Sequence, residues 1–389
     1  MRKIYTGIDI GTYHVKVVIA SPAENSELPM HILGTGTSSS RGMRHGYIID
    51  PKEASKSIRE ALMRASTSAK VPVRRARVAL GGVGLDEMHS SGDVTLTQSG
   101  GIVTDRDIER ALRESEKRIV SKLNNRTIFH TIPLESRIDG AKVLGKPHGL
   151  QGTKLSVDTL LVTMLSKHHD DLIAAVEEVG IEVEDVMASS LAASLVTLTK
   201  AQKTAGVVLA NIGAETLSII VFDNNVPISL KVFPIGSSNI TDSIALTFQI
   251  PLNEAESLKR GGVTGSDVSH KKMQSIVASE LKEMFTLINA HLKSIGRQRL
   301  LPAGIVITGG GSGFGNAQDI ARQILKLPAA IGQVGYLPRS SSVDASWAVA
   351  YGLCKWAYGE DIGGKSYSLS EVLHSAQDSI KNAIRSLLP

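Results

Sequence analysis

The sequence predicts an α/β protein of two similar lobes, on three observations. With 389 residues, the chain exceeds the roughly 250–300 residues at which a single hydrophobic core stops growing. Hydrophobic residues make up 42% of it, aromatic residues only 4%, and 36 positions are glycine, a composition typical of α/β proteins with many tight turns. The pattern Ile-Asp-Ile-Gly-Thr at 8–12 returns as Ala-Asn-Ile-Gly-Ala at 210–214, roughly 200 residues later, which indicates a duplicated domain.

The composition also indicates a compartment. The single cysteine, Cys354, excludes an internal disulfide framework and favours a reducing compartment, where we expect it to be a small buried residue. Asp9 interrupts any apolar core of a signal peptide, and no apolar run approaches the roughly 18 residues of a membrane-spanning helix. We therefore expect a cytoplasmic protein. The densest basic run, at 74–77, has no aromatic neighbours that could stack on bases, so nucleic-acid binding is not expected.

Strands and a capped helix are expected in the first part of the chain. Residues 4–20 form two β-rich runs around a Gly-Thr turn, and a strand near 31–36 follows. The pair Asp50-Pro51 predicts the start of a helix, because Asp is a favoured N-cap and Pro fits the first turn. Residues 75–80 predict another strand.

Residues 83–165 differ from their surroundings and indicate an inserted module, with short strands, loops that contain Gly and Pro, and a capped helix beginning near Thr104. A helix at 169–179 and a strand near 181–187 then return to the first pattern, and the second hairpin follows at 206–222. Later elements are expected as helices at 239–249, 253–260 and 268–296, a buried strand with a Gly-rich turn at 303–314, and helices from Asn316 and at 345–357.

Two further patterns resemble ligand sites but are interpreted otherwise. Residues 359–366 match the Walker A pattern, but the segment before them reads as a helix rather than the buried strand that a P-loop follows, so we expect a linker. The run His-His-Asp-Asp at 168–171 suggests a metal site. Adjacent histidines diverge on a helix, however, and we expect Asp170 to be a helix cap or first-turn acid.

The two hairpins are expected to bind the phosphates of a nucleotide. A tight turn with glycine lets backbone N–H groups approach a phosphate closely. In the first hairpin, Asp9 could hold the water shell of a Mg²⁺ ion, and Gly11 and Thr12 would supply donors. Lys16 faces the same side as Thr12 by strand alternation and could reach a phosphate. Taken alone, the motif equally fits an ordinary surface hairpin.

A third element favours the nucleotide interpretation. Residues 307–311, Ile-Thr-Gly-Gly-Gly, end a predicted strand with three glycines, which would let an adenosine lie against bare backbone. Two phosphate hairpins and a glycine floor are similar to the nucleotide cleft of the actin-like ATPases. That resemblance implies two ribonuclease-H-like lobes around a cleft that binds ATP with Mg²⁺.

Longer segments resemble one family of that superfamily, FtsA, the bacterial actin-like cell-division proteins. Residues 40–62, 132–163 and 232–261 resemble FtsA stretches, and with a C-terminal amphipathic helix the resemblance covers nearly the whole chain. It implies an FtsA-type inserted subdomain. The subdomains would be 1A at 1–82 (with 166–199 and 338–362), the inserted 1C at 83–165, 2A at 200–238 (with 302–337), 2B at 239–301, and a linker with a membrane-targeting helix at 363–389.

The resemblance also implies the remaining site residues. Glu256 and Lys259 match the family's residues that flank the ribose and base, and their spacing puts both on one helix face; an exposed ion pair is the alternative. No catalytic residue can be assigned. The nucleotide-binding residues expected are Asp9, Gly11, Thr12, Lys16, Asn211, Gly213, Thr216, Glu256, Lys259, Gly309, Gly310 and Gly311, with Asp9 holding Mg²⁺ through water.

The second hairpin departs from the family. Its FtsA pattern resembles Asp-Ile-Gly-Gly-Gly-Thr, whereas residues 211–216 read Asn-Ile-Gly-Ala-Glu-Thr. Asn211 brings no negative charge to hold the metal ion. Ala214 and Glu215 restrict the backbone, and Glu215 would add a like charge near the γ-phosphate. We expect ATP to be bound and hydrolysed very slowly or not at all.

The last segment predicts an amphipathic helix that begins with a capping box at Ser368 and Glu371. Its apolar stripe would dock on the protein's own core or a partner, or lie in a membrane interface. The linker at 363–364 and the terminal position favour the membrane, although the tail has no aromatic residue and only Lys381 and Arg385 are basic. The residues expected to enter the membrane are Leu369, Val372, Leu373, Ile380, Ile384, Leu387 and Leu388.

The resemblance implies a division adaptor. Such a protein binds ATP, assembles into filaments, lies on the inner face of the cell membrane and holds the FtsZ ring there, with the FtsZ C-terminal peptide on 2B and later division proteins on 1C. One alternative is a small-molecule kinase of the superfamily, but we identify no carboxylate base beside an acceptor. The other is an FtsA-like pilus-assembly scaffold, against which the 83–165 insertion and the tail both argue.

Overall fold

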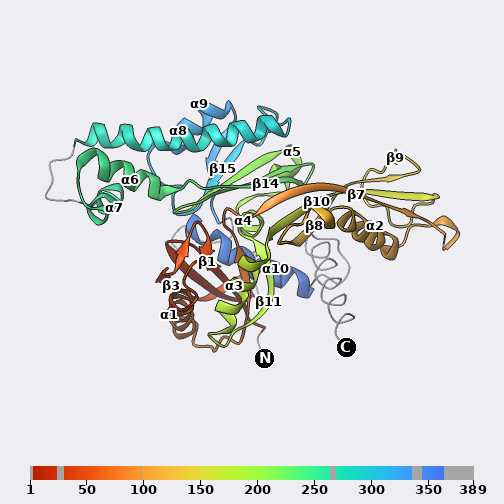
Figure 1. The fold of residues 1–389 in the computed structure, drawn as a ribbon, viewed down its shortest axis with the longest axis horizontal. Coiled ribbons are helices and arrows are strands. Elements are labelled where there is room, and N and C mark those ends of the chain that lie inside the picture. Colours follow the sequence, from red (N-terminus) through yellow and green to blue (C-terminus); the bar gives the residue numbers. More distant parts are fainter. Residues whose placement is uncertain (1–2, 24–29, 98, 263–268, 335–343, 363–389) are drawn as a thin grey trace. The chain divides into compact units, whose positions relative to one another are not determined.

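A computed structural model gives the fold of the chain (Figure 1) and describes residues 3–23, 30–97, 99–262, 269–334 and 344–362. The chain divides into two compact units. The first unit consists of Met1–Val83, Asp171–Val226 and Lys231–Ala357. The second consists of Gly84–Asp170 and Pro227–Leu230, with the end of helix α10 (Ala348–Ile362) from Tyr358.

The first unit contains two lobes, and the first lobe is built on a five-stranded sheet in the order β11-β6-β1-β2-β3. Strand β1 is central and mostly buried; it pairs antiparallel with β2 and parallel with β6. The strands are β1 (Tyr5–Ile10), β2 (His14–Pro22), β3 (Met30–Ser39), β6 (Arg75–Leu80) and β11 (Glu182–Ala188).

The second lobe repeats this topology in the order β14-β13-β12-β15-β16. Strand β12 takes the place of β1, because it pairs antiparallel with β13 and parallel with β15. The duplication predicted from the repeated hairpin is therefore confirmed. The strands are β12 (Val207–Ile212), β13 (Leu217–Asp223), β14 (Val226–Phe233), β15 (Ile305–Thr308) and β16 (Ala329–Ile331).

Helices cover both sheets. Helix α1 (Pro51–Ala69) begins at Asp50, whose side chain accepts from the N–H groups of Lys52 and Glu53. It packs closely on β3, because a Cβ added at Gly36 would lie 2.1 Å from the carbonyl oxygen of Ala61. The other helices are α3 (Ser166–Glu177), α4 (Ser189–Thr197), α5 (Lys200–Ala205), α6 (Ser237–Phe248), α7 (Leu252–Lys259), α8 (His270–Ser294), α9 (Ala317–Leu325) and α10.

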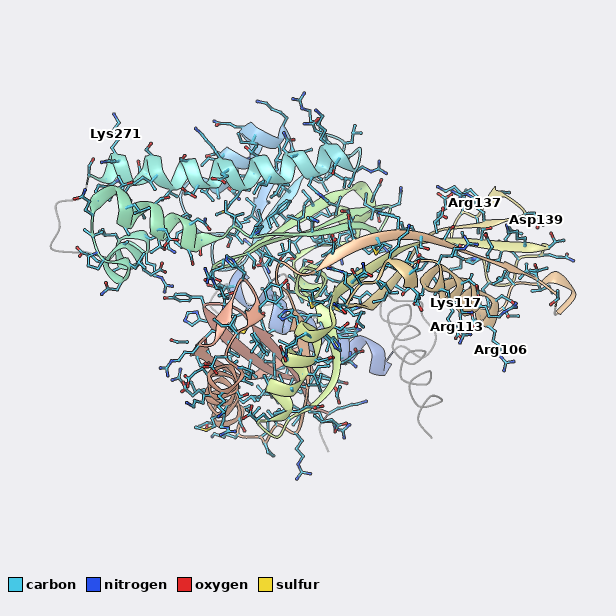
Figure 2. The ribbon with its side chains drawn as sticks, in the orientation of Figure 1. Arg106, Arg113, Lys117, Arg137, Asp139 and Lys271 are labelled. Carbon is cyan, nitrogen blue, oxygen red and sulfur yellow. The ribbon has the colours of Figure 1, made fainter. Side chains whose placement is uncertain are left out.

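The second unit is an antiparallel sheet covered by one helix. The sheet has the order β7-β10-β8-β9, with β7 (Asp86–Thr95), β8 (Arg126–Ile138), β9 (Ala141–Lys142) and β10 (Lys154–Leu165). Helix α2 (Asp105–Lys117) begins with a capping box at Thr104. Arg106, Arg113 and Lys117 lie on its exposed side (Figure 2). Its other side meets β7 at Gly92, where an added Cβ would lie 1.8 Å from the carbonyl oxygen of Ala111.

Most predicted elements are confirmed, and two local predictions are wrong. The strand expected at 75–80 has the bounds of β6, and the helices expected at Asp50-Pro51 and Thr104 begin there. Asp170 is not a helix cap, because α3 already begins at Ser166. The start of the Walker-like segment, at 359–362, belongs to α10. The predicted tail helix lies outside the described residues.

The expectation for the cysteine is also confirmed. Cys354 on α10 is fully buried, and burial raises the pKa of its thiol to about 12. Within the described ranges, no helix combines the length and the apolar character needed to cross a bilayer.

Candidate functional site

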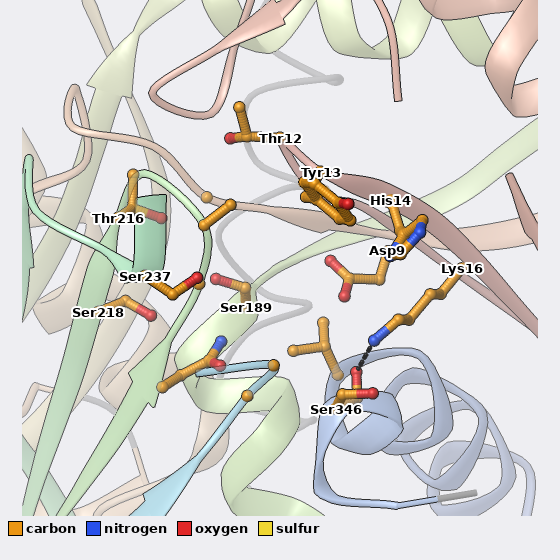
Figure 3. Close-up of a pocket in the computed structure, with 18 of the residues that line it drawn as sticks. Asp9, Thr12, Tyr13, His14, Lys16, Ser189, Thr216, Ser218, Ser237 and Ser346 are labelled. Carbon is orange, nitrogen blue, oxygen red and sulfur yellow. Dashed lines mark hydrogen bonds between the residues drawn. The ribbon is translucent and has the colours of Figure 1, made fainter. Parts of the chain in front are cut away.

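A cavity of about 480 Å³ lies at the ends of the two central strands, β1 and β12. Both hairpin turns, the starts of α6 and α10, helix α7 and the glycines after β15 contribute to its walls (Figure 3). Every residue predicted to bind the nucleotide lines it except Gly311. Gly311 is buried behind the wall, where its N–H donates to the carbonyl oxygen of Ile212 at 2.9 Å.

The two hairpins close in the same way. The N–H of Gly11 donates to the carbonyl oxygen of His14 at 3.1 Å, and that of Gly213 donates to Thr216 at 2.8 Å. The N–H of Gly11 is therefore used within the turn, and its role as a donor to a phosphate stays a prediction. The residue after the glycine in each turn, Thr12 in the first hairpin and Ala214 in the second, lines the cavity.

Asp9 and Lys16 lie beside the first hairpin (Figure 3), where they are register partners on β1 and β2. Burial raises the pKa of Asp9 to about 6, although the nearby Lys16 ammonium opposes the shift. The Lys16 Nζ donates to the carbonyl oxygen of Ser346 at 2.7 Å, which fixes it at the cavity wall, and burial lowers its pKa. A bound cation would favour the ionised form of Asp9.

Glu256 and Lys259 are joined, but not as the exposed pair of the alternative interpretation. The Lys259 side chain is only 2% exposed. Its ammonium lies 2.6 Å from Glu256 Oε2 and donates to Thr241 Oγ1 at 2.7 Å and to the carbonyl oxygen of Ser237 at 3.0 Å. An ammonium has three donors, so Lys259 is satisfied within the protein and acts by positioning Glu256.

The other oxygen of Glu256 holds an arginine that sequence reasoning missed. The Nε of Arg260 donates to Glu256 Oε1 at 2.7 Å, and the Arg260 side chain remains 51% exposed. Burial favours protonation of Glu256, but the hydrogen bonds from Lys259 and Thr241 outweigh it and lower the pKa of this carboxyl. Arg260 is therefore the half-exposed cation on this side of the cavity.

The glycine floor has one closed and one open position. At Gly309 the φ angle is +91°, and an added Cβ would lie 2.3 Å from Asn211 Oδ1, so this position requires glycine. At Gly310 an added Cβ would meet nothing within 4 Å. The open space at Gly310 faces the cavity and is the part of the floor that a bound nucleoside would fill.

Several lining residues were not predicted, and only some carried a signal. Gly81 and Gly82 follow β6 as the glycine floor follows β15, so the duplication could have identified them. Tyr13, Arg260 and Phe314 belong to no pattern that distinguishes them. Conversely, Glu215 was expected near the γ-phosphate but is not a lining residue; its carboxylate accepts from the backbone N–H of His45 at 2.5 Å.

The cavity suits a nucleotide with Mg²⁺. Its volume is within the range of small-molecule sites, and turn amides, bare backbone and the cations Lys16 and Arg260 line it. No cluster of three metal-ligating side chains occurs in the described part of the chain. Asp9 alone fits a Mg²⁺ ion, because that ion keeps several waters and is commonly held by one or two carboxylates with substrate phosphates.

Family models match two segments of the chain. The model of the cell division protein FtsA matches residues 208–352, which contain the second hairpin and the glycine floor. A model of the SHS2 domain inserted in FtsA matches residues 82–163.

Curated relatives match over most of their length. The cell division protein FtsA of Borreliella burgdorferi is 28% identical, over 90% of this chain and 90% of its own. FtsA of Pseudomonas aeruginosa is 26% identical, over 97% of this chain and 94% of its own.

Solved structures show the fold. The structure of a PilM-PilN type IV pilus biogenesis complex matches with a TM-score of 0.70 at 17% identity, over 91% of this chain and 98% of that one. MreB5 of Spiroplasma citri bound to ADP matches with a TM-score of 0.53 at 12% identity, over 93% of this chain and 99% of that one. With the matching sheets of the two lobes, these likenesses show the actin-like fold that the sequence predicted.

A first prediction tests whether the open floor is a ligand site. Gly310→Val should leave the thermal stability unchanged, because the added side chain enters open space, but it should weaken binding of a fluorescent ATP analogue by at least about tenfold. Gly359→Val is the control, since it also meets nothing within 4 Å but lies outside the cavity. Full affinity in Gly310→Val would place the ligand elsewhere.

A second prediction follows from the raised pKa of Asp9. Because its folded pKa of about 6 exceeds the unfolded value of 3.8, the nucleotide-free protein should lose stability as the pH rises between these values. The Asp9→Asn variant lacks this loss, so its advantage over wild type in unfolding free energy should grow from near zero at pH 4 to about 2–3 kcal/mol at pH 7. Urea titrations at both pH values measure it, with the exposed Asp319→Asn as control. A stability advantage of Asp9→Asn that does not change with pH would contradict the raised pKa of Asp9.

Proposed function

We propose a function that proceeds from one fact: the chain belongs to the FtsA family of actin-like cell-division proteins. In this proposal the protein binds ATP in the cavity between its lobes, assembles into filaments with further copies and tethers the FtsZ ring to the cytoplasmic membrane. The duplicated hairpins that meet at one cavity carry the proposal, because they provide a phosphate site contributed by both lobes. A pilus-assembly role is supported only by the likeness in fold to the PilM-PilN complex, at 17% identity.

The chain's own residues would hold the nucleotide as follows. The turn amides at Thr12 and Ala214 approach the phosphates, Lys16 and Arg260 neutralise them, and the open floor at Gly310 receives the nucleoside. Asp9 would orient the waters of a Mg²⁺ ion, which when bound neutralises phosphate charge. Each lobe then contacts the same ligand, so ATP stabilises one closed arrangement of the lobes.

Hydrolysis is proposed to be very slow or absent, because the second hairpin lacks charge. Asn211 has Ser218 as its register partner on β13, where the first hairpin has the pair Asp9 and Lys16. Phosphoryl transfer depends on positioning and charge stabilisation more than binding does. With a strand carboxylate at only one of the two hairpins, Asp9 alone would hold a Mg²⁺ ion there, and ATP would act mainly as a structural ligand.

The membrane and partner surfaces complete the proposal. The tail from Ser368 would lie in the inner membrane surface, weakly for one copy and firmly for a filament, because each further tail binds at high effective concentration. In 2B, Leu246 is 80% and Leu252 59% exposed beside a hollow that both residues line. Such an apolar hollow suits the FtsZ C-terminal peptide. The 1C insertion would contact later division proteins.

The third prediction concerns turnover. Single-turnover hydrolysis of ATP should be very slow in wild type and at least about tenfold faster in the double variant Asn211→Asp with Glu215→Gly, because charge and backbone freedom return to the second hairpin. The control Glu215→Ala removes the carboxylate without giving the backbone the freedom of glycine. Brisk wild-type turnover, unchanged in the double variant, would show that this hairpin is not deficient.

The fourth prediction tests membrane binding by the tail and peptide binding by the 2B hollow in one experiment. Wild-type protein should carry a labelled FtsZ C-terminal peptide into the pellet with anionic vesicles. Leu373→Glu, Ile384→Glu and removal of 366–389 should each leave protein and peptide in the supernatant, because a charge or a deletion disrupts the apolar stripe. Leu252→Asp should leave the protein in the pellet but reduce the bound peptide at least about tenfold.

The exposed Met63→Asp on α1 is the matched control and should behave as wild type. Undiminished sedimentation of all three tail variants would refute the tail as anchor. Peptide retained by Leu252→Asp would move the docking site away from the 2B hollow.

A further inference from the structure

The tips of the two hairpins reach across the cavity from equivalent positions. Each turn has four residues, Gly11 to His14 and Gly213 to Thr216, closed by the same backbone hydrogen bond. The third residue is Tyr13 in one turn and Glu215 in the other. Tyr13 belongs to the first lobe and contacts Arg260, which follows α7. Glu215 belongs to the second lobe and contacts the turn between β4 (Met43–Arg44) and β5 (Tyr47–Ile48) of the first.

The Glu215 contact is the stronger of the two. Its carboxylate accepts from the N–H of His45 at 2.5 Å, and the His45 ring nitrogen Nδ1 lies 3.3 Å from the backbone oxygen of Glu215 and 3.8 Å from its carboxylate. A hydrogen bond to a carboxylate is shorter and about twice as strong as a neutral one. Both side chains are only partly exposed, so water screens the contact incompletely.

The turn that carries His45 is fixed in place to receive it. His45 itself has a φ of +49°, in the left-handed region that a residue with a side chain seldom adopts. Its carbonyl oxygen accepts from the N–H of Val83 at 3.2 Å, and the N–H of Gly46 donates to Thr12 Oγ1 at 3.2 Å. A Cβ at Gly46 would lie 2.4 Å from the Cα of Gly82. Close packing and hydrogen bonds thus hold the His45 N–H where Glu215 meets it.

The Tyr13 contact adds a second bridge. The Arg260 guanidinium lies 4.9 Å from the centre of the Tyr13 ring, and Glu256 anchors the same guanidinium through Nε. Tyr13 and Arg260 both line the cavity, so this bridge lies over the space that a ligand must enter. Both bridges are made by groups of the protein itself.

We propose that Glu215 is a clasp between the lobes: by binding His45 it holds the cleft closed without nucleotide, and Tyr13 with Arg260 supports it. The consequence for nucleotide exchange rests on the proposed function. Because the clasp must open for a nucleotide to enter and to leave, it slows both steps and changes the equilibrium affinity little. This differs from repulsion of the γ-phosphate by Glu215, which would weaken ATP binding but not ADP binding.

Two measurements test the clasp on the full chain. In nucleotide-free protein, hydrogen exchange at the His45 amide should be slow in wild type and at least about tenfold faster in Glu215→Ala, with Glu215→Gln between them because an amide oxygen still accepts. In stopped-flow experiments with fluorescent ATP and ADP analogues, Glu215→Ala should raise the association and dissociation rates of both by about tenfold. Tyr13→Ala should raise them less, and the exposed Glu182→Ala on β11 should leave them as in wild type.

The outcomes separate the clasp from the proposed function. Unchanged His45 exchange in Glu215→Ala overturns the clasp whether or not nucleotide binds. Faster His45 exchange in a protein that binds neither analogue supports the clasp and refutes the nucleotide site. Tighter ATP binding in Glu215→Ala, with ADP unaffected, overturns the clasp in favour of repulsion.

Discussion

One backbone hydrogen bond, repeated in both lobes, is the constraint on which the cleft depends. The glycine that begins each hairpin turn donates to the carbonyl three residues later, Gly11 to His14 and Gly213 to Thr216. An added Cβ at Gly11 would lie 2.9 Å from the His14 oxygen, so the turn is as tight as glycine permits. Because the bond uses the glycine N–H, the next two residues form the tip, and their identity decides what the hairpin does.

The two hairpins carry different charges on their strands and tips, although the same backbone hydrogen bond closes both turns. In the first lobe the register pair at the hairpin is Asp9 with Lys16, and in the second it is Asn211 with Ser218. The negative charge lost from the strand of the second lobe appears at its tip, as Glu215. There it faces His45 of the other lobe rather than the cavity. The tip of the second hairpin therefore makes a contact between the lobes.

The sequence predicted what depends on local pattern. Helix caps at Asp50 and Thr104, the bounds of β6 and the duplicated hairpin follow from residue types at short spacing, and the structure confirms them. The predicted residues of the hairpins and of the glycine floor, except Gly311, line one cavity because the ends of equivalent strands meet there, and Glu256 and Lys259 reach the same cavity from α7. Asp170 was misread since a cap depends on where the helix begins, and α3 begins one turn earlier.

What the sequence could not predict depends on partners distant in the chain. Lys259 lines the cavity, but Thr241 and the Ser237 carbonyl accept from its ammonium, and spacing along α7 does not reveal these residues on α6. Glu215 meets a residue 170 positions earlier, and its direction depends on the left-handed turn at His45. In both cases the contacting residues lie outside the local sequence pattern from which the prediction was made.

These distant contacts support the proposal that the cleft binds a nucleotide and hydrolyses it poorly. A site that catalyses phosphoryl transfer needs charge placed against both sides of the reacting group. At the hairpins, the first lobe has the charged register pair Asp9 and Lys16, and the carboxylate at the tip of the second hairpin, Glu215, contacts His45. In the proposed function, Glu215 stabilises lobe closure rather than turnover, which suits a protein that closure, rather than hydrolysis, prepares for assembly.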